Sequence, residues 1–130
     1  MAGPALALDM AQALRDAMDD PEFRREMRFF TGVLTIGVGS TVTAARFDDG
    51  KLVEVPTAGP TDTDRRIDIH GTEDHWDYML QGYPVPFYQC LQTAAVKHGL
   101  ELSTTYETFA YLPALNRLVQ LLRARRTERS

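Results

Sequence analysis

The sequence predicts an α+β domain in which helices cover one sheet. Segments between residues 30 and 70 have the two-residue period of β-strands, and apolar residues then recur at the spacing of amphipathic helices. The segments come in the order helix, four strands, two helices, strand, helix, so the apolar helices can pack on the sheet. At 130 residues the chain is long enough for one domain with its own core.

We expect this single domain to span residues 1–130, with N-terminal helices at 6–28, the sheet and its covering helices at 30–124, and a basic tail at 123–130. Apolar residues recur at helical spacing from residue 6 to residue 18. Asp20 followed by Pro21 is typical of an N-cap and a first helical position, which predicts a second short helix.

Residues 30–70 predict four strands. Gly39-Ser40 and Asp48-Asp49-Gly50 supply the glycine that tight hairpin turns favour, which predicts two hairpins from strands at 30–38, 41–47 and 51–55. Residues 56–64 are rich in Gly, Pro, Thr and Asp and predict a loop, and a short strand follows at 66–70.

Two helices are expected next. Thr72 is typical of an N-cap for a helix that Gly82 ends. The following helix is expected to begin at Phe87, because apolar residues recur from there at i+3, i+4, i+7 and i+8, and Gly99 is expected to end it.

The sequence after residue 99 predicts one more strand, followed by apolar helical segments. The strand is expected at 100–104. A helical turn at 106–112 and a longer helix from Pro113 are expected as two pieces, because a proline inside one helix costs about 3 kcal/mol.

Composition restricts the function classes. A net charge of −4 argues against a nucleic-acid binder, which needs a basic face. Residues 123–130 carry four arginines against Glu128, and we interpret them as a frayed, solvated helix end that complements the helix dipole, with a weak contact to an anionic surface as the alternative. Cys90 is the only cysteine, so no intramolecular disulfide forms. Without a signal peptide or a span of ~20 apolar residues, we expect a cytoplasmic protein with no integral membrane association.

Several segments together resemble a known family. They are the hairpin Asp48-Asp49-Gly50-Lys51, the run 67–72, the helix 73–80 before Gly82, and Gly99-Leu100-Glu101-Leu102 before the last apolar helix. Over about residues 23–123 the chain resembles the sterol-carrier-protein (sterol-transfer) domain family. The resemblance implies a five-stranded, mainly antiparallel sheet covered by helices, with a hydrophobic tunnel between them for a fatty acyl chain, sterol or similar lipid.

The chain departs from that family pattern in two places. Ser103-Thr104-Thr105-Tyr106 replaces the usual Gly-Asp after the last strand, and the connector at 83–88 is unusually aromatic and rich in proline. Both departures indicate a pocket of different shape.

The first functional hypothesis is a protein that binds or carries a hydrophobic small molecule (lipid, sterol-like, or polyketide- or terpenoid-like) in an apolar cavity between sheet and helices. Apolar burial would supply the affinity, at about 25 cal/mol per Å². No cofactor is expected. The residues expected to line the cavity belong to the apolar helical stripes: Trp76, Met79, Leu80, Phe87, Leu91, Phe109, Leu112, Leu115 and Val119.

Two alternatives stay open. A small cofactor-independent cyclase, isomerase or dehydratase would use the polar residues near the strand-to-helix junction for proton transfer. A homodimeric structural or partner-binding module would use an exposed apolar patch. No metal site is expected, because zinc needs three or four ligands of defined geometry. The candidates for the enzymatic alternative are His70, His75, Asp77, Tyr78, Tyr83 and Tyr88.

Overall fold

The computed structural model describes residues 3–55, 57 and 66–129, and the side chains among them except those of 3–9 and 127–129. The elements, in chain order, are α1 (Gly3–Ala17), α2 (Pro21–Met27), β1 (Gly32–Val38), β2 (Thr41–Asp48), β3 (Lys51–Glu54), β4 (Arg66–Gly71), α3 (Glu73–Met79), α4 (Leu91–His98), β5 (Glu101–Leu102), α5 (Tyr106–Ala110) and α6 (Leu112–Arg129).

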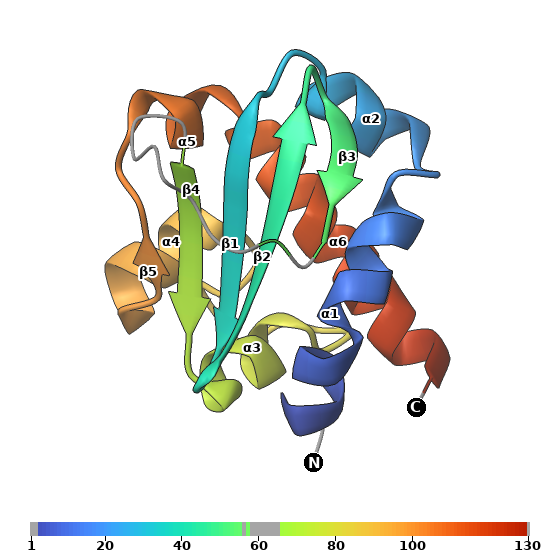
Figure 1. Ribbon diagram of the computed structural model, residues 1–130. Helices are drawn as coiled ribbons and strands as arrows, with labels where there is room; N and C mark the ends of the chain where they lie inside the picture. The colour runs from blue at the N-terminus through green and yellow to red at the C-terminus, as the bar shows by residue number, and fades with distance from the viewer. Residues whose placement is uncertain (1–2, 56, 58–65, 130) are drawn as a thin grey trace.

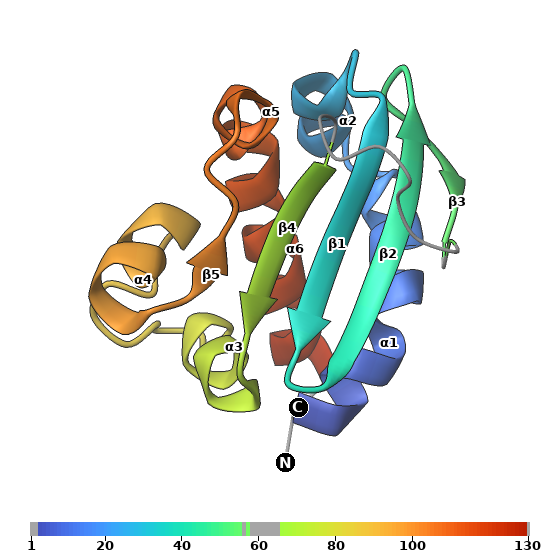
Figure 2. The ribbon, with the colours of Figure 1, turned by 60° about the vertical axis from the view of Figure 1, so that its left-hand side comes forward.

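The strands form one sheet in the order β3-β2-β1-β4-β5. The β1–β2, β2–β3 and β4–β5 pairs are antiparallel, and the central β1–β4 pair is parallel. The predicted fold class, a five-stranded and mainly antiparallel sheet covered by helices, is therefore confirmed. α6 lies behind the sheet in both ribbon views, and Figure 2 shows α1 behind β2 on the same face (Figures 1 and 2).

The core lies between the sheet and these helices. Because side chains alternate along a strand, one face of each strand supplies it. The buried pattern of β4, where Ile67 and Ile69 are buried and their neighbours half-exposed, shows the alternation. The largest fully buried side chains are Trp76, Phe23, Phe30, Phe47, Met10, Leu14, Met27, Leu34, Ile36, Ile67, Ile69 and Met79. Within the described residues, no helix combines the length and the hydropathy that a bilayer span requires.

Local signals placed most elements correctly. The Asp20 carboxylate accepts from the Phe23 N–H at 2.8 Å, and the Thr72 hydroxyl accepts from the His75 N–H at 3.1 Å, so both predicted N-caps are confirmed. Gly99 ends α4 with φ 76°, the left-handed conformation that favours glycine. The helix expected to break before Pro113 is two helices, α5 and α6. The loop expected at 56–64 lies outside the described residues apart from Thr57.

The expected start of α4 at Phe87 is wrong. Phe87 has φ 73°, which no residue of a right-handed helix adopts, and α4 begins at Leu91 with Cys90 as its N-cap. The Thr93 hydroxyl donates to the Phe87 carbonyl at 2.7 Å and holds this turn. β5 is also shorter than expected, with two residues, and α3 ends at Met79, before Gly82.

The expectation of a frayed, solvated end at residues 123–130 is wrong for residues 123–126, and the side chains of 127–130 lie outside the described ones. The helix α6 continues to Arg129, and three of its arginines, Arg123, Arg125 and Arg126, bind other helices. Arg123 Nε and Nη2 donate to the Met79 carbonyl at the end of α3 at 3.0 and 2.8 Å. Arg125 pairs with Asp16 of α1, and Arg126 pairs with Asp77 of α3. Burial lowers the pKa of Arg123. These residues therefore tie α6 to the helices beside it.

Candidate functional site

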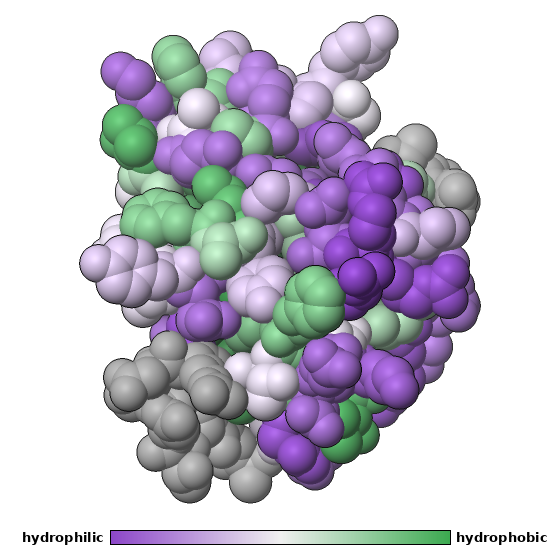
Figure 3. All heavy atoms as spheres, turned by 90° about the horizontal axis from the view of Figure 1, so that it is seen from above, coloured by the Kyte–Doolittle hydropathy of each residue, from purple (hydrophilic) through white to green (hydrophobic). Residues whose placement is uncertain are grey.

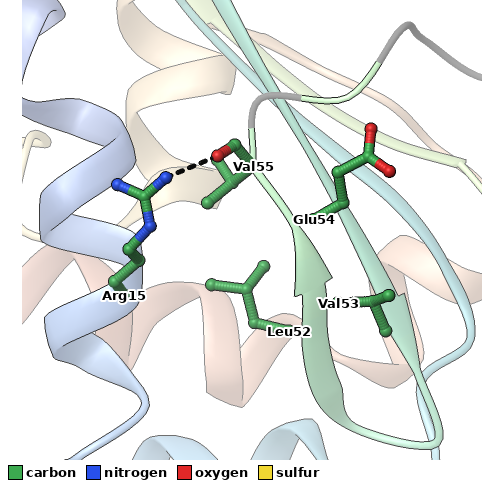
Figure 4. Close-up of a pocket in the computed structure, with 5 residues that line it drawn as sticks. All are labelled: Arg15, Leu52, Val53, Glu54 and Val55. Carbon is green, nitrogen blue, oxygen red and sulfur yellow. Dashed lines mark hydrogen bonds between the residues drawn. The ribbon is translucent and has the colours of Figure 1, made fainter.

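A pocket of about 410 Å³ opens between α1 and β3. It is lined by Arg15 of α1 and by residues 52–55 at the end of β3. In Figure 4 Leu52 points toward Arg15 and the Arg15 guanidinium is directed at Val55, whereas Val53 and Glu54 point away from the opening. Val55 is buried in the core, and Leu52 packs against the core. The inner wall is therefore continuous with the hydrophobic interior.

The pocket lies at the edge of the sheet because the edge strand β3 is short and irregularly paired. β3 is four residues long, and its register with β2 shifts between Arg46 and Phe47. Such an irregularity bends a strand away from ideal pairing. Leu52 is paired with Phe47 and shares the core face, while Glu54 pairs with Arg46, whose guanidinium lies 3.4 Å from its carboxylate. One side of the short strand is thus apolar and faces α1.

Arg15 supplies the positive charge of the pocket, and the other charged residue of its lining, Glu54, points away from the opening (Figure 4). Its Nη2 donates to the Val55 carbonyl at 2.6 Å, which holds the guanidinium at the rim. A guanidinium has five N–H donors in a planar fork and no acceptor, so donors remain to bind a carboxylate or phosphate. An apolar wall beside a fixed cation suits a molecule with an apolar body and an anionic end.

The residues predicted to line the cavity do not line this pocket. Most are fully buried in the core behind it, Leu112 is half-buried, and the exposed fractions of Phe87 and Phe109 are 47% and 56%. Phe87 and Phe109 thus face solvent in this structure. The buried members of the predicted set are Trp76, Met79, Leu80, Leu91, Leu115 and Val119. Sequence periodicity did not single out Arg15, because an arginine on the polar face of a helix is usually solvated.

A second pocket, of about 350 Å³, lies where β4 meets α3. It contains two predicted candidates, His70 and His75, together with Glu101. The His70 ring lies against Gly37 of β1 so closely that a Cβ at residue 37 would be 1.8 Å from its Cδ2. Glycine at residue 37 therefore leaves the room that the ring occupies, and any larger residue there would displace it. His70 Nδ1 lies 3.7 Å from a Glu101 carboxylate oxygen.

His75 has both ring nitrogens engaged by the main chain. Its Nδ1 accepts from the Thr72 N–H at 3.1 Å, which requires the proton of the neutral ring to be on Nε2. Nε2 then donates to the His98 carbonyl at 2.9 Å. His75 therefore links the start of α3 to the end of α4, and these bonds leave neither nitrogen available to a substrate.

The structure brings only some of the other enzymatic candidates together. The Tyr78 and Tyr88 rings are 5.7 Å apart, and Tyr88 stacks on His98 at 4.1 Å between centroids. Burial raises the pKa of Tyr88, with Tyr78 and Asp74 adding to the shift, so its hydroxyl stays protonated at neutral pH. Asp77 is paired with Arg126, and Tyr83 is 95% exposed. Within the part of the chain that the structure describes, no group of three or more His, Cys, Asp or Glu could hold a metal ion.

Comparison with solved structures identifies the fold. The chain is similar to the crystal structure of sterol carrier protein 2, with a TM-score of 0.63 and 21% identity over 87% of this chain and 92% of that one. It is also similar to the solution structure of a conserved hypothetical protein from Thermus thermophilus, described as possibly a sterol carrier protein, with a TM-score of 0.56 and 18% identity over 92% and 85% of the two chains. No family model and no curated protein matches the sequence. The chain therefore has a sterol-carrier-protein-like fold, as its sequence motifs predicted.

Proposed function

We propose that this protein binds a hydrophobic small molecule with an anionic end, of the fatty-acid class, and that the pocket between α1 and β3 receives the anionic end. The observation that carries the proposal is the pairing of Arg15 with an apolar wall, Leu52 and Val55, that continues into the core. The fold similarity supports a lipid-like ligand in general terms. At about 410 Å³ the pocket lies within the ~300–1,000 Å³ typical of small-molecule sites.

The apolar wall of the pocket offers the ligand's apolar part a route inward. Leu52 and Val55 contact the core layer between the sheet and the helices. The buried residues of the predicted lining set, such as Trp76 and Leu115, belong to the same layer. We therefore keep them as the proposed inner part of the site. Because these side chains are packed, a ligand that reaches them has to separate α1 from the sheet.

The carboxylate contact gives the first prediction. Replacing Arg15 by glutamine should weaken the binding of cis-parinaric acid, a fluorescent fatty acid, by about tenfold, because a hydrogen bond to a charged group contributes ~1.5–3 kcal/mol and this site is partly open to water. Its methyl ester should bind the wild type and Arg15→Gln equally. Fluorescence titration measures both affinities, and Arg24→Gln, an exposed arginine on α2, is the matched control.

The two probes separate the possible results. Equal weakening of acid and ester would show that Arg15 shapes the pocket and does not bind the carboxylate. An absence of saturable binding by either probe, together with no lipid in an extract of the purified protein, would contradict the proposed function itself.

The inner part of the site gives the second prediction. Trp76 is the only tryptophan and is 1% exposed, so its fluorescence reports on the core alone. A stearic acid with a nitroxide near the end of its chain should quench Trp76 strongly and saturably, and one with the nitroxide beside the carboxylate should quench it less. Iodide in the buffer should leave the fluorescence of Trp76 unquenched. If the order of the two lipids is reversed, the acyl chain does not extend into the predicted layer.

A further inference from the structure

The chain is almost uncharged between Asp77 and Glu101. These 23 residues contain no Asp or Glu and one lysine, Lys97, whereas a quarter of the whole chain is charged. They comprise the end of α3, the connector 81–90 and α4. Figure 2 shows α4 at one side of the molecule, beside β5 and well away from α1 and α2.

Large hydrophobic side chains are exposed on this uncharged segment. Tyr83 is 95% exposed, Val96 79%, Phe87 47% and Tyr78 40%. Ring contacts connect several of them. Tyr78 lies beside Tyr88, which stacks on His98, and the Phe87 ring is 6.2 Å from His98. The Lys97 ammonium lies 5.3 Å from the centre of the Phe87 ring. Tyr88 and His98 thus link Tyr78 to Phe87. We call the exposed side chains of this segment the connector face: Tyr78, Tyr83, Phe87, Val96 and Lys97.

The connector face is held in place by specific contacts. Phe87 has φ 73°, a left-handed conformation that is unfavourable for a residue other than glycine. The Thr93 hydroxyl binds the carbonyl of Phe87, and His98 Nε2 lies 2.8 Å from the carbonyl of Pro86. Tyr88 is 4% exposed and packs in the hydrophobic core, so it fixes the connector to the body of the protein. The structure therefore keeps the Phe87 ring at the surface against a conformational cost.

We propose that the connector face binds the surface of a phospholipid bilayer. Tyrosine and other aromatic rings favour the boundary between headgroups and acyl chains, and lysine can extend its ammonium to a lipid phosphate while its alkyl chain stays in apolar surroundings. The segment itself carries no carboxylate, so in a protein whose net charge is −4 it repels those phosphates less than the rest of the surface does. Asp74 of α3, which acts on Tyr88, is the acidic group near this face. This docking goes beyond ligand binding and does not depend on Arg15.

Flotation with lipid vesicles tests the proposal. The wild type should float with vesicles of phosphatidylcholine containing one-third phosphatidylglycerol. The double variant Tyr83→Ser/Phe87→Asn should bind at least fivefold more weakly; asparagine is chosen because it tolerates positive φ. Lys97→Gln should lose the preference for phosphatidylglycerol over pure phosphatidylcholine and keep the remainder of the binding.

The chain offers a matched control on α5. Tyr106 and Phe109 are 94% and 56% exposed, close to the values of Tyr83 and Phe87. α5 lies at the end of the molecule seen in Figure 3, where hydrophobic residues are scattered among hydrophilic ones. Tyr106→Ser/Phe109→Asn should therefore leave flotation unchanged. Circular dichroism melts of both double variants verify that each is folded.

Three results would overturn the proposal. The first is a wild-type protein that floats with neither type of vesicle. The second is an equal loss of vesicle binding in the two double variants, which would indicate nonspecific adsorption through any exposed aromatic residue. In the third, light scattering would show that Tyr83→Ser/Phe87→Asn converts a dimer to a monomer, and the connector face would then be a contact between two copies. Arg15→Gln, which should still float like the wild type, separates this test from that of the proposed function.

Discussion

Replacing Trp76 by alanine is expected to lower the free energy of unfolding by about 3–5 kcal/mol, the cost of a large cavity in a packed core. Trp76 is 1% exposed, and its indole N–H donates to the Gly37 carbonyl of β1 at 2.9 Å. The side chain thus joins α3 to the middle of the sheet by packing and by a hydrogen bond. Urea unfolding followed by far-ultraviolet circular dichroism measures the change.

The variant Trp76→Phe separates the contribution of packing from that of the indole hydrogen bond. It keeps most of the apolar volume but removes the N–H, so the Gly37 carbonyl loses a buried partner, which costs roughly 1–3 kcal/mol. Tyr83→Ala, at a 95% exposed position, should change stability by less than about 0.5 kcal/mol. A Trp76→Ala variant as stable as Tyr83→Ala would contradict the central place that the structure gives this residue.

The order and type of the elements could be predicted because their signals are local. The hairpin turns, the caps at Asp20 and Thr72 and the glycine at 99 act within a few residues of themselves, and tertiary packing agrees with all of them. Phe87 is the exception. Its spacing continued the apolar pattern of α4, but periodicity cannot distinguish a helical turn from a loop that has the same spacing.

Features that join distant parts of the chain could not be predicted in this way. Arg123 and Arg126 reach α3 across more than forty residues, so a local interpretation treated them as solvated. Arg15 acquires its neighbours only because β3 ends opposite α1. The predicted ligand-lining residues were chosen as apolar helix faces, and such faces identify the core but not an opening into it.

The second large effect is expected at Asp20, which connects α2 to α6. Its carboxylate accepts from the Phe23 N–H and from Arg117 Nε and Nη2 at 3.0 and 2.8 Å, although the two side chains are 97 positions apart. Asp20→Ala removes the N-cap and leaves the Arg117 guanidinium without this partner. We expect a loss of about 2–3 kcal/mol, from ~1 kcal/mol for the cap and the remainder for the charged hydrogen bonds.

Asp20→Asn separates these two contributions, because asparagine also caps helices but carries no charge. It should cost about 1 kcal/mol, and Arg117→Gln should cost about the same. If the two carboxylate functions are independent, the loss in Asp20→Ala exceeds the loss in Asp20→Asn by the value of the cap. Equal losses in Asp20→Ala and Asp20→Asn would show that the cap contributes nothing.

The dependence on pH gives the same interaction an independent test. The hydrogen bonds from Arg117, and after them the one from the Phe23 N–H, lower the pKa of Asp20 from 3.8 to about 2. A carboxylate with a lowered pKa stabilises the folded state above its unfolded pKa, and that stabilisation disappears as the pH falls through the folded value. The difference in unfolding free energy between wild type and Asp20→Asn should therefore be constant from pH 7 to about pH 5 and decrease between about pH 4 and pH 2. All other carboxylates titrate in both proteins, so the difference in unfolding free energy isolates Asp20. If that difference stays constant down to about pH 2, the charge pair with Arg117 does not stabilise the fold.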